Sequence, residues 1–167
     1  PEDVRRMARW CLLDWFGSAL AGAKAKPTAI LLDVARELGG RPEATLRPDG
    51  SKTSAPLAAL VNAGSSHVVE MDDVHMQAVF HPGATVIPSA LAVAEREGAS
   101  GADLLGAIVA GYEVGIRLGE AAGQRHYDYW HTTGTCGTFA AAAAAGKLLG
   151  LDSGRLAAAL GSAGTQA

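Results

Sequence analysis

Residues 131–150 read HTTGTCGTFAAAAAAGKLLG, with an unbroken run of alanine at 140–145. Alanine has the highest intrinsic helix propensity, so this stretch predicts a helix over about 133–149. Its glycines and alanines carry little or no side chain, which lets a neighbouring helix approach closely. The stretch therefore favours a core built by tight helix-on-helix packing.

The rest of the chain repeats the helical pattern on both sides of this stretch. Apolar residues recur at helical spacing over 3–20, namely Met7, Ala8, Cys11, Leu12, Trp15, Phe16 and Ala19. A second such stripe follows Pro27 and consists of Ile30, Leu31, Val34, Ala35 and Leu38. Further helices are predicted over about 54–67, 84–97, 100–119 and 153–164.

Residues 41–53 interrupt the helical pattern. Residues 44–47 are typical of a short extended piece, and Pro48–Asp49–Gly50 is typical of a turn. The sequence has no alternation of strands and helices. We therefore expect residues 1–167 to form a single all-α, multi-helix domain.

Composition excludes several classes of protein. Of 167 residues, 49% are apolar, which is enough for a sizeable core. A formal charge of -3 without a basic stripe argues against a nucleic-acid partner. The longest apolar run, 139–145, is far shorter than the roughly 20 residues that cross a bilayer, so no membrane partner is expected. We expect a soluble cytoplasmic protein, because no signal peptide precedes the first helix, with Cys11 and Cys136 reduced.

The stretch HVVEMDDVH at 67–75 concentrates ionisable residues. If the preceding helix continued through it, His67, Glu70 and Asp73 would share one face, with Asp72 about 100° away. Carboxylates crowded together repel one another, so at least one should have a raised pKa and be able to act as a general acid or base. The alternative is a solvated acidic helix end, which the apolar neighbours Val68, Val69, Met71 and Val74 argue against.

Two histidines precede predicted helices. His81–Pro82–Gly83 stands before the helix at 84–97, where free N–H groups and the helix dipole favour an anion such as a substrate carboxylate. His131 stands before the helix at 133–149, with Thr132 or Thr133 expected as its cap. Each feature also occurs as an ordinary turn or cap. Their repetition favours a function.

A metal site is a further alternative. Glu70, Asp72, Asp73, His75 and His81 are all ligand types. However, the chain has no H-E-x-x-H, E-x-x-H or C-x-x-C motif, and three acids on one regular helix cannot converge on a single ion. We expect no metal and no cofactor.

Several segments in order resemble the MmgE/PrpD family, which includes 2-methylcitrate dehydratase, cis-aconitate decarboxylase and iminodisuccinate epimerase. They are CLLDWFGSALAG (11–22), AGSSHVVEMDDVH (63–75), FHPGATVIPSALAVAE (80–95), GASGADLLGAIVAGYEVGIRLG (98–119), WHTTGTCGTFAAAAAAGKLLGL (130–151) and ALGSAGTQA (159–167). The resemblance implies a large helical domain followed by a smaller α/β lid domain, usually as a homodimer. It implies an active site in the cleft between them, without a metal or organic cofactor.

By this resemblance, residues 1–167 are part of the helical domain, truncated before the lid and before a lysine-containing segment of the site, so the fragment alone should be inactive. The catalytic residues would be Glu70, Asp72, His81 and His131. The substrate-binding residues would be His67, Asp73, Gly83 and, with less support, Arg117, for which a surface or inter-helix ion pair is the alternative. Glu70 and Val74 depart from the decarboxylase pattern, which has Asp and Thr there, and favour the epimerase-like branch.

Together with the resemblance, these features predict a metal-independent, dehydratase-like lyase that acts on a small di- or tricarboxylate. His81 and its helix N-terminus would hold a substrate carboxylate, Glu70 or Asp72 would move a proton, and His131 would act on the leaving group. One alternative is an epimerase of an amino- or iminodicarboxylate. Another is a non-catalytic scaffold, in which the small residues at 137–146 form a dimer interface.

Overall fold

The computed structural model describes residues 1–167 and confirms the all-α class. It contains seven α-helices, which are α1 (Glu2–Gly22), α2 (Lys26–Leu38), α3 (Ala55–His67), α4 (Pro82–Glu97), α5 (Gly101–Ala122), α6 (Thr132–Leu148) and α7 (Ser153–Ala163). A short 3-10 helix, η1 (Gln124–Asp128), follows α5. None of the helices combines the length and apolarity that crossing a membrane requires.

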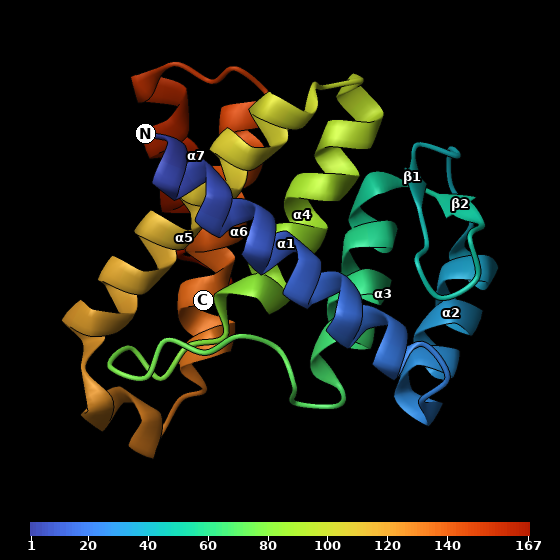
Figure 1. Ribbon diagram of the computed structural model, residues 1–167, viewed down its shortest axis with the longest axis horizontal. Coiled ribbons are helices and arrows are strands. Elements are labelled where there is room, and N and C mark those ends of the chain that lie inside the picture. Colours follow the sequence, from blue (N-terminus) through green and yellow to red (C-terminus); the bar gives the residue numbers. More distant parts are fainter.

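Helix α4 lies at the centre of the molecule and packs against α3, α5 and α6 (Figure 1). Helix α1 crosses the front of this layer diagonally and contacts α3, α4 and α5 (Figure 1). The predicted inward residues of α4, Val86, Ala90, Leu91 and Ala94, are all buried. They belong to the larger core or flank it, together with Trp15 of α1 and Phe80 from the loop before α4.

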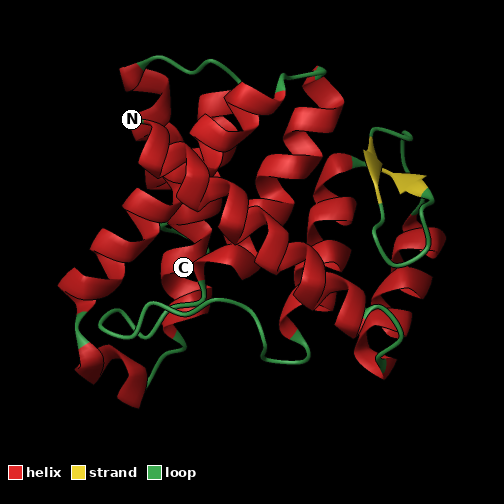
Figure 2. Cartoon of the chain, viewed as in Figure 1, coloured by secondary structure: helices red, strands yellow, loops and turns green.

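The predicted extended piece and turn form a two-stranded antiparallel hairpin. Strand β1 (Ala44–Thr45) pairs with β2 (Lys52–Thr53), with Ala44 opposite Thr53. The hairpin lies beside α2 and α3 at one end of the molecule, where Figure 2 shows its strands in yellow. Here Leu46 joins a second, smaller core with Leu32 and Val61.

Close helix packing depends on glycine, as the composition suggested. A Cβ added to Gly111 of α5 would lie 2.5 Å from Cγ1 of Val86 on α4. One added to Gly115 would lie 2.8 Å from Cβ of Ala140 in the alanine run of α6. The backbones of these helices can therefore approach only because the side chains are missing at these positions.

The predicted apolar stripes are only partly buried. In α2, Ile30, Val34 and Leu38 are exposed, whereas Leu32 and Ala35 face the smaller core. Met7 of α1 is also exposed. The buried face was misassigned because, when two adjacent faces of a helix are both rich in apolar residues, helical spacing does not show which of them is buried.

A long loop, residues 68–81, connects α3 to α4 and carries the acidic stretch (Figure 2). Helix α3 ends at His67, and Glu70 adopts a left-handed conformation with φ of 47°. The expectation that His67, Glu70 and Asp73 share a helical face is therefore wrong. Met71 and Val74, expected near the core, are 69% and 46% exposed.

Candidate active site

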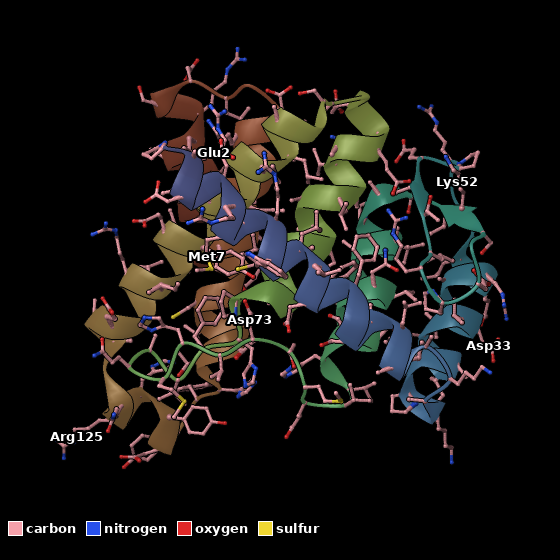
Figure 3. All side chains as sticks on the ribbon, in the orientation of Figure 1. Glu2, Met7, Asp33, Lys52, Asp73 and Arg125 are labelled. Carbon is pink, nitrogen blue, oxygen red and sulfur yellow. The ribbon has the colours of Figure 1, made fainter.

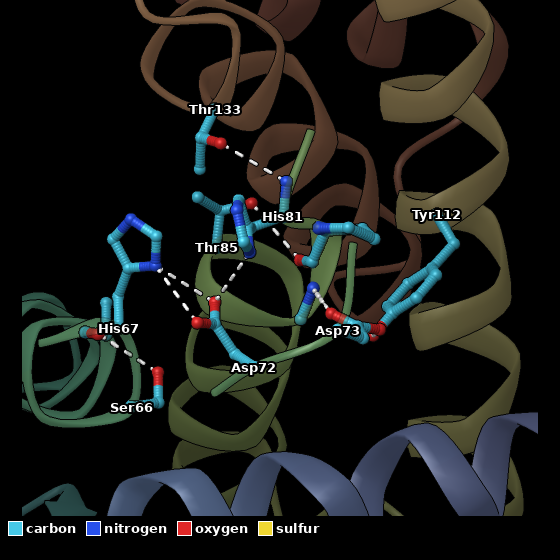
Figure 4. Close-up of polar contacts among 11 residues, drawn as sticks. Ser66, His67, Asp72, Asp73, His81, Thr85, Tyr112 and Thr133 are labelled. Atoms are coloured by element: carbon cyan, nitrogen blue, oxygen red, sulfur yellow. Dashed lines mark hydrogen bonds and ion pairs between the residues drawn. The ribbon is translucent and has the colours of Figure 1, made fainter. Parts of the chain in front are cut away.

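The loop 68–81 brings ionisable side chains to the C-terminus of α3 and to the N-termini of α4 and α6. His67 is the last residue of α3. His81 and His131 occupy the N-cap positions of α4 and α6. Asp72 lies on the loop between His67 and His81 (Figure 4). Four of the predicted site residues thus meet at one place, although a different backbone path from the expected one brings them there.

Asp72 is the centre of this cluster. Its carboxylate lies 3.0 and 3.2 Å from Nδ1 of His67, and 3.5 Å from Nδ1 of His81 (Figure 4). The Asp72 side chain is only 1% exposed, whereas those of His67 and His81 are 30% and 25% exposed. Nδ1 of His81 is buried and has no hydrogen-bond partner. The two imidazoles therefore form the accessible rim of a site whose carboxylate is buried.

His131 completes the rim from the side of α6. Its ring centroid lies 6.1 Å from that of His67, and the rings of His67 and His81 are 5.0 Å apart. Partial burial lowers the pKa of His131, and the nearby His67 and His81 lower it further, whereas Glu70 acts in the opposite direction. Glu70 thus lies near enough to influence His131, but it is exposed. A lowered pKa favours the neutral imidazole, which can accept a proton.

Asp73 points away from the histidines, into the interior. It accepts hydrogen bonds from the Gly83 N–H at 2.9 Å and from the Tyr112 hydroxyl at 2.7 Å. Figure 3 labels Asp73 near the middle of the view, whereas the charged residues Asp33, Lys52 and Arg125 lie toward its edges.

One acid of the stretch, Asp73, has a raised pKa, but the main cause is burial and not the mutual repulsion that was expected. Burial outweighs the hydrogen bonds from Tyr112 and Gly83, while repulsion by Asp14 and Asp72 adds less. Burial, together with Asp73, also raises the pKa of Tyr112, which therefore remains a hydrogen-bond donor.

The contacts of Asp73 and Gly83 differ from the substrate contacts expected of them. The Gly83 N–H donates to Asp73 and is not free for a ligand. A Cβ on Gly83 would lie 2.6 Å from Oδ1 of Asp73, so glycine is needed for this contact. The two residues hold the first turn of α4, and with it His81, in place.

The structure also adds residues that the sequence did not assign. Tyr112 anchors Asp73, and the signal for it was a hydroxyl on an otherwise apolar helix face, where a buried Tyr needs a partner. Thr133 accepts a hydrogen bond from the backbone N–H of His81 at 3.2 Å and so connects α4 to α6. The expectation that Thr132 or Thr133 caps α6 is wrong, because the N-cap is His131 and it makes no side-chain cap.

Two other predicted residues lie elsewhere. Arg117 forms a salt bridge at 2.7 Å with Glu113 of the same helix, α5, and both side chains are exposed, so it is the surface ion pair of the alternative interpretation. Arg117 lines a cavity of about 350 Å³ between α1 and α5 whose walls contain none of the histidines. His75 faces Glu120, with Nε2 3.8 Å from its Oε1.

A single group of side chains has the composition and spacing of a metal site. One ligand atom each from His67, Asp72 and His81 lie within 4.8 Å of one another. This set differs from the five residues considered from the sequence, because Asp73 and His75 are engaged elsewhere and Glu70 is exposed. The two cysteines, Cys11 and Cys136, are free thiols, as predicted.

Similarity to known proteins extends along the whole chain. A family model described as the MmgE/PrpD N-terminal domain matches residues 1–167. The cis-aconitate decarboxylase of Aspergillus terreus is 31% identical over 174 residues, and a cis-aconitate decarboxylase-like protein of Aspergillus oryzae is 31% identical over 176 residues. Each alignment covers 100% of this chain and 36% of the relative, so the chain spans little more than a third of their length.

Proposed function

Because this chain belongs to the MmgE/PrpD family, we propose that it contributes the acid–base half of a lyase site for a small di- or tricarboxylate. The observation that carries the proposal is the convergence of three imidazoles, from His67, His81 and His131, around one buried carboxylate. Imidazoles can bind a carboxylate and transfer protons near neutral pH, so the cluster suits a reaction at a carbon next to a carboxylate. The reaction needs no metal ion.

His67 and His81 hold a substrate carboxylate in this mechanism. Their rings form the accessible rim, and His81 stands at the N-terminus of α4, where the helix dipole favours negative charge. Asp72, which is almost fully buried, positions both imidazoles. This changes the role expected for Asp72 from proton transfer to positioning, because its oxygens already face two rings.

His131 moves the proton. It lies beside the two carboxylate-binding rings, and its lowered pKa keeps it neutral and able to accept a proton next to them. Glu70, exposed near His131, is the remaining carboxylate that can exchange this proton with solvent. Negative charge that develops on the substrate is stabilised by the positive end of α4 and by the two rings.

Decarboxylation is the second candidate reaction. It is favoured by the relatives, since the aligned proteins are a cis-aconitate decarboxylase and a decarboxylase-like protein. Dehydration, the first candidate, and decarboxylation both develop negative charge on a carbon next to a carboxylate, so the same rings and helix N-terminus can stabilise it. In dehydration His131 accepts the proton, whereas in decarboxylation CO₂ leaves and His131 delivers a proton to the carbon. The epimerase and scaffold alternatives stay predictions, as do the homodimer and the lid domain.

The test is turnover by the full-length protein with the substitutions His131→Gln, His81→Ala and Glu70→Gln. The substrates are 2-hydroxy tricarboxylates, unsaturated tricarboxylates and aminodicarboxylates, which separate dehydration, decarboxylation and epimerisation. Loss of a general acid or base is expected to lower kcat by about 10²–10⁴-fold for His131→Gln. His75→Ala is the matched control, because this histidine faces Glu120 outside the cluster.

Wild-type turnover in both His131→Gln and His81→Ala would remove these residues from the mechanism. An absence of turnover on all three substrate classes, by a folded wild-type protein, would favour the scaffold alternative instead. Size-exclusion chromatography of the same preparations tests the homodimer.

A further inference from the structure

We infer that His67, Asp72 and His81 form a three-ligand site for a divalent transition-metal ion, and that its occupation inhibits the proposed reaction. The inference starts from distance. Ligands that hold one ion at about 2.1 Å are separated by about 3.0–3.4 Å in octahedral or tetrahedral geometry. Oδ2 of Asp72 lies 3.0 Å from Nδ1 of His67, within this range, and 3.5 Å from Nδ1 of His81, just above it, and one ligand atom from each of the three residues lies within 4.8 Å of the others.

The donor set determines the class of ion. Two imidazole nitrogens and a carboxylate oxygen suit Zn²⁺, Co²⁺ or Fe²⁺, whereas Mg²⁺ and Ca²⁺ prefer sites made of oxygen ligands. Nδ1 of both histidines faces the carboxylate, so the two rings present their donor atoms to the same point.

Nδ1 of His81 supplies an independent argument. This atom is buried and makes no hydrogen bond, although it is a polar group that normally finds a partner, and the Asp72 carboxylate lies 3.5 Å away. A metal ion between it and Asp72 would give the nitrogen that partner. Such an ion would also neutralise the carboxylate, which is 1% exposed.

The site is open on one side. Asp72 is buried, but the side chains of His67 and His81 are 30% and 25% exposed, so an ion can enter from the rim. Three protein ligands leave at least one coordination position for water or a ligand.

The expected effect on activity follows from the shared side chains, His67, Asp72 and His81. In the proposed reaction the two rings hold the substrate carboxylate, and a bound ion would engage their Nδ1 atoms and fix Asp72. This part of the inference rests on the proposed function, whereas the binding site itself does not.

The test is titration of the metal-free, full-length protein with Zn²⁺ alone, followed by isothermal calorimetry, and with Co²⁺, followed by its visible absorption. We expect one ion per chain. His67→Ala should weaken binding at least about 10-fold, since even the partners of metal ligands contribute that much. His75→Ala removes a histidine outside the cluster and should bind as the wild type does.

His67→Ala is the main variant because its side chain is partly exposed and its loss leaves the fold intact, which circular dichroism checks. Asp72→Asn is the second variant. Saturable binding that neither variant weakens, or no saturable binding by the wild type, would overturn the site and leave the proposed function standing. Turnover that is unchanged at saturating Zn²⁺ would overturn the inhibition, whereas the calorimetry reads out the site even if no substrate is turned over.

Discussion

The Tyr112 hydroxyl donates a 2.7 Å hydrogen bond to Oδ2 of Asp73, across 39 residues of sequence. The other carboxylate oxygen of Asp73 accepts the Gly83 N–H at 2.9 Å. One side chain therefore connects α5 to the acidic loop and to the first turn of α4. Because Asp72 directly precedes Asp73, this anchor turns Asp72 toward the opposite side, where the histidines lie.

Tyr112→Phe is expected to destabilise the fold. The substitution removes the hydroxyl and keeps the ring, so a largely buried carboxylate loses one of its two donors. Hydrogen bonds to charged groups contribute about 1.5–3 kcal/mol, and a loss in this range should appear as a lower free energy of unfolding in urea. Tyr127→Phe is the control, because Tyr127 is 48% exposed. Equal stability of the two variants would show that the anchor contributes nothing.

The fold could be predicted from the sequence because each helix has a local signal. The capping pair Ser100 and Asp103 starts α5, with the Asp103 N–H donating to the Ser100 hydroxyl. The turn at Pro48–Asp49–Gly50 joins the two strands of the hairpin. The loop 68–81 could not be predicted, because contacts that are distant in sequence determine its path. Its left-handed residues, Glu70 and Val79, are not of the types that usually signal a turn.

The candidate site could be predicted only in part, because its histidines have local sequence signals and its acids do not. His81 and His131 each precede a helix, and they meet because α4 packs against α6 and the His81 N–H bonds to Thr133. Asp72 faces the histidines and Asp73 faces the interior. This difference depends on Tyr112, which no short sequence motif connects to the two acids. Adjacent acids of the same type give no local sign of which one faces the interior.

Gly115→Ala is expected to destabilise the contact between α5 and α6. Its Cβ would lie 2.6 Å from Phe80 and 2.8 Å from Ala140, both in the core, and overpacking of this kind costs about 1–3 kcal/mol. Gly17→Ala is the matched control within α1, where no atom lies within 4 Å of the added Cβ. Because alanine is the better helix former, that variant should gain up to about 1 kcal/mol. Both free energies of unfolding come from urea titrations, and a loss in Gly17→Ala would contradict this packing.

The stability contributed by Asp49 should depend on pH. Burial alone would raise its pKa, but hydrogen bonds from Ser51 and Arg36 outweigh burial and lower the pKa. A carboxyl group with a lowered pKa in the folded state stabilises the fold at neutral pH and loses that effect as the pH falls through the folded pKa. Since Asp49 contacts solvent, we expect Asp49→Asn to cost at most about 1 kcal/mol at pH 7, and the difference from wild type to vanish in acid.

Urea titrations at neutral pH and at about pH 3 measure this difference. Asp33→Asn is the control, because Asp33 pairs with the same arginine at 3.0 Å but makes no bond to Ser51. It should change stability less than Asp49→Asn does. A difference between wild type and Asp49→Asn that grows as the pH falls would reverse the predicted sign.

The two thiols should react slowly with iodoacetamide. Burial raises the pKa of Cys136, and burial together with the nearby Asp73 raises that of Cys11. Only the thiolate is nucleophilic, and each unit of raised pKa lowers its fraction about tenfold at neutral pH. Mass spectrometry of the native protein at pH 7.5 should therefore show both cysteines modified at least about tenfold more slowly than in the urea-unfolded protein, which serves as the control. Cys136 should be the slower of the two, because it is buried and Cys11 is partly exposed. Rapid modification of Cys136 would contradict its position on the core-facing side of α6.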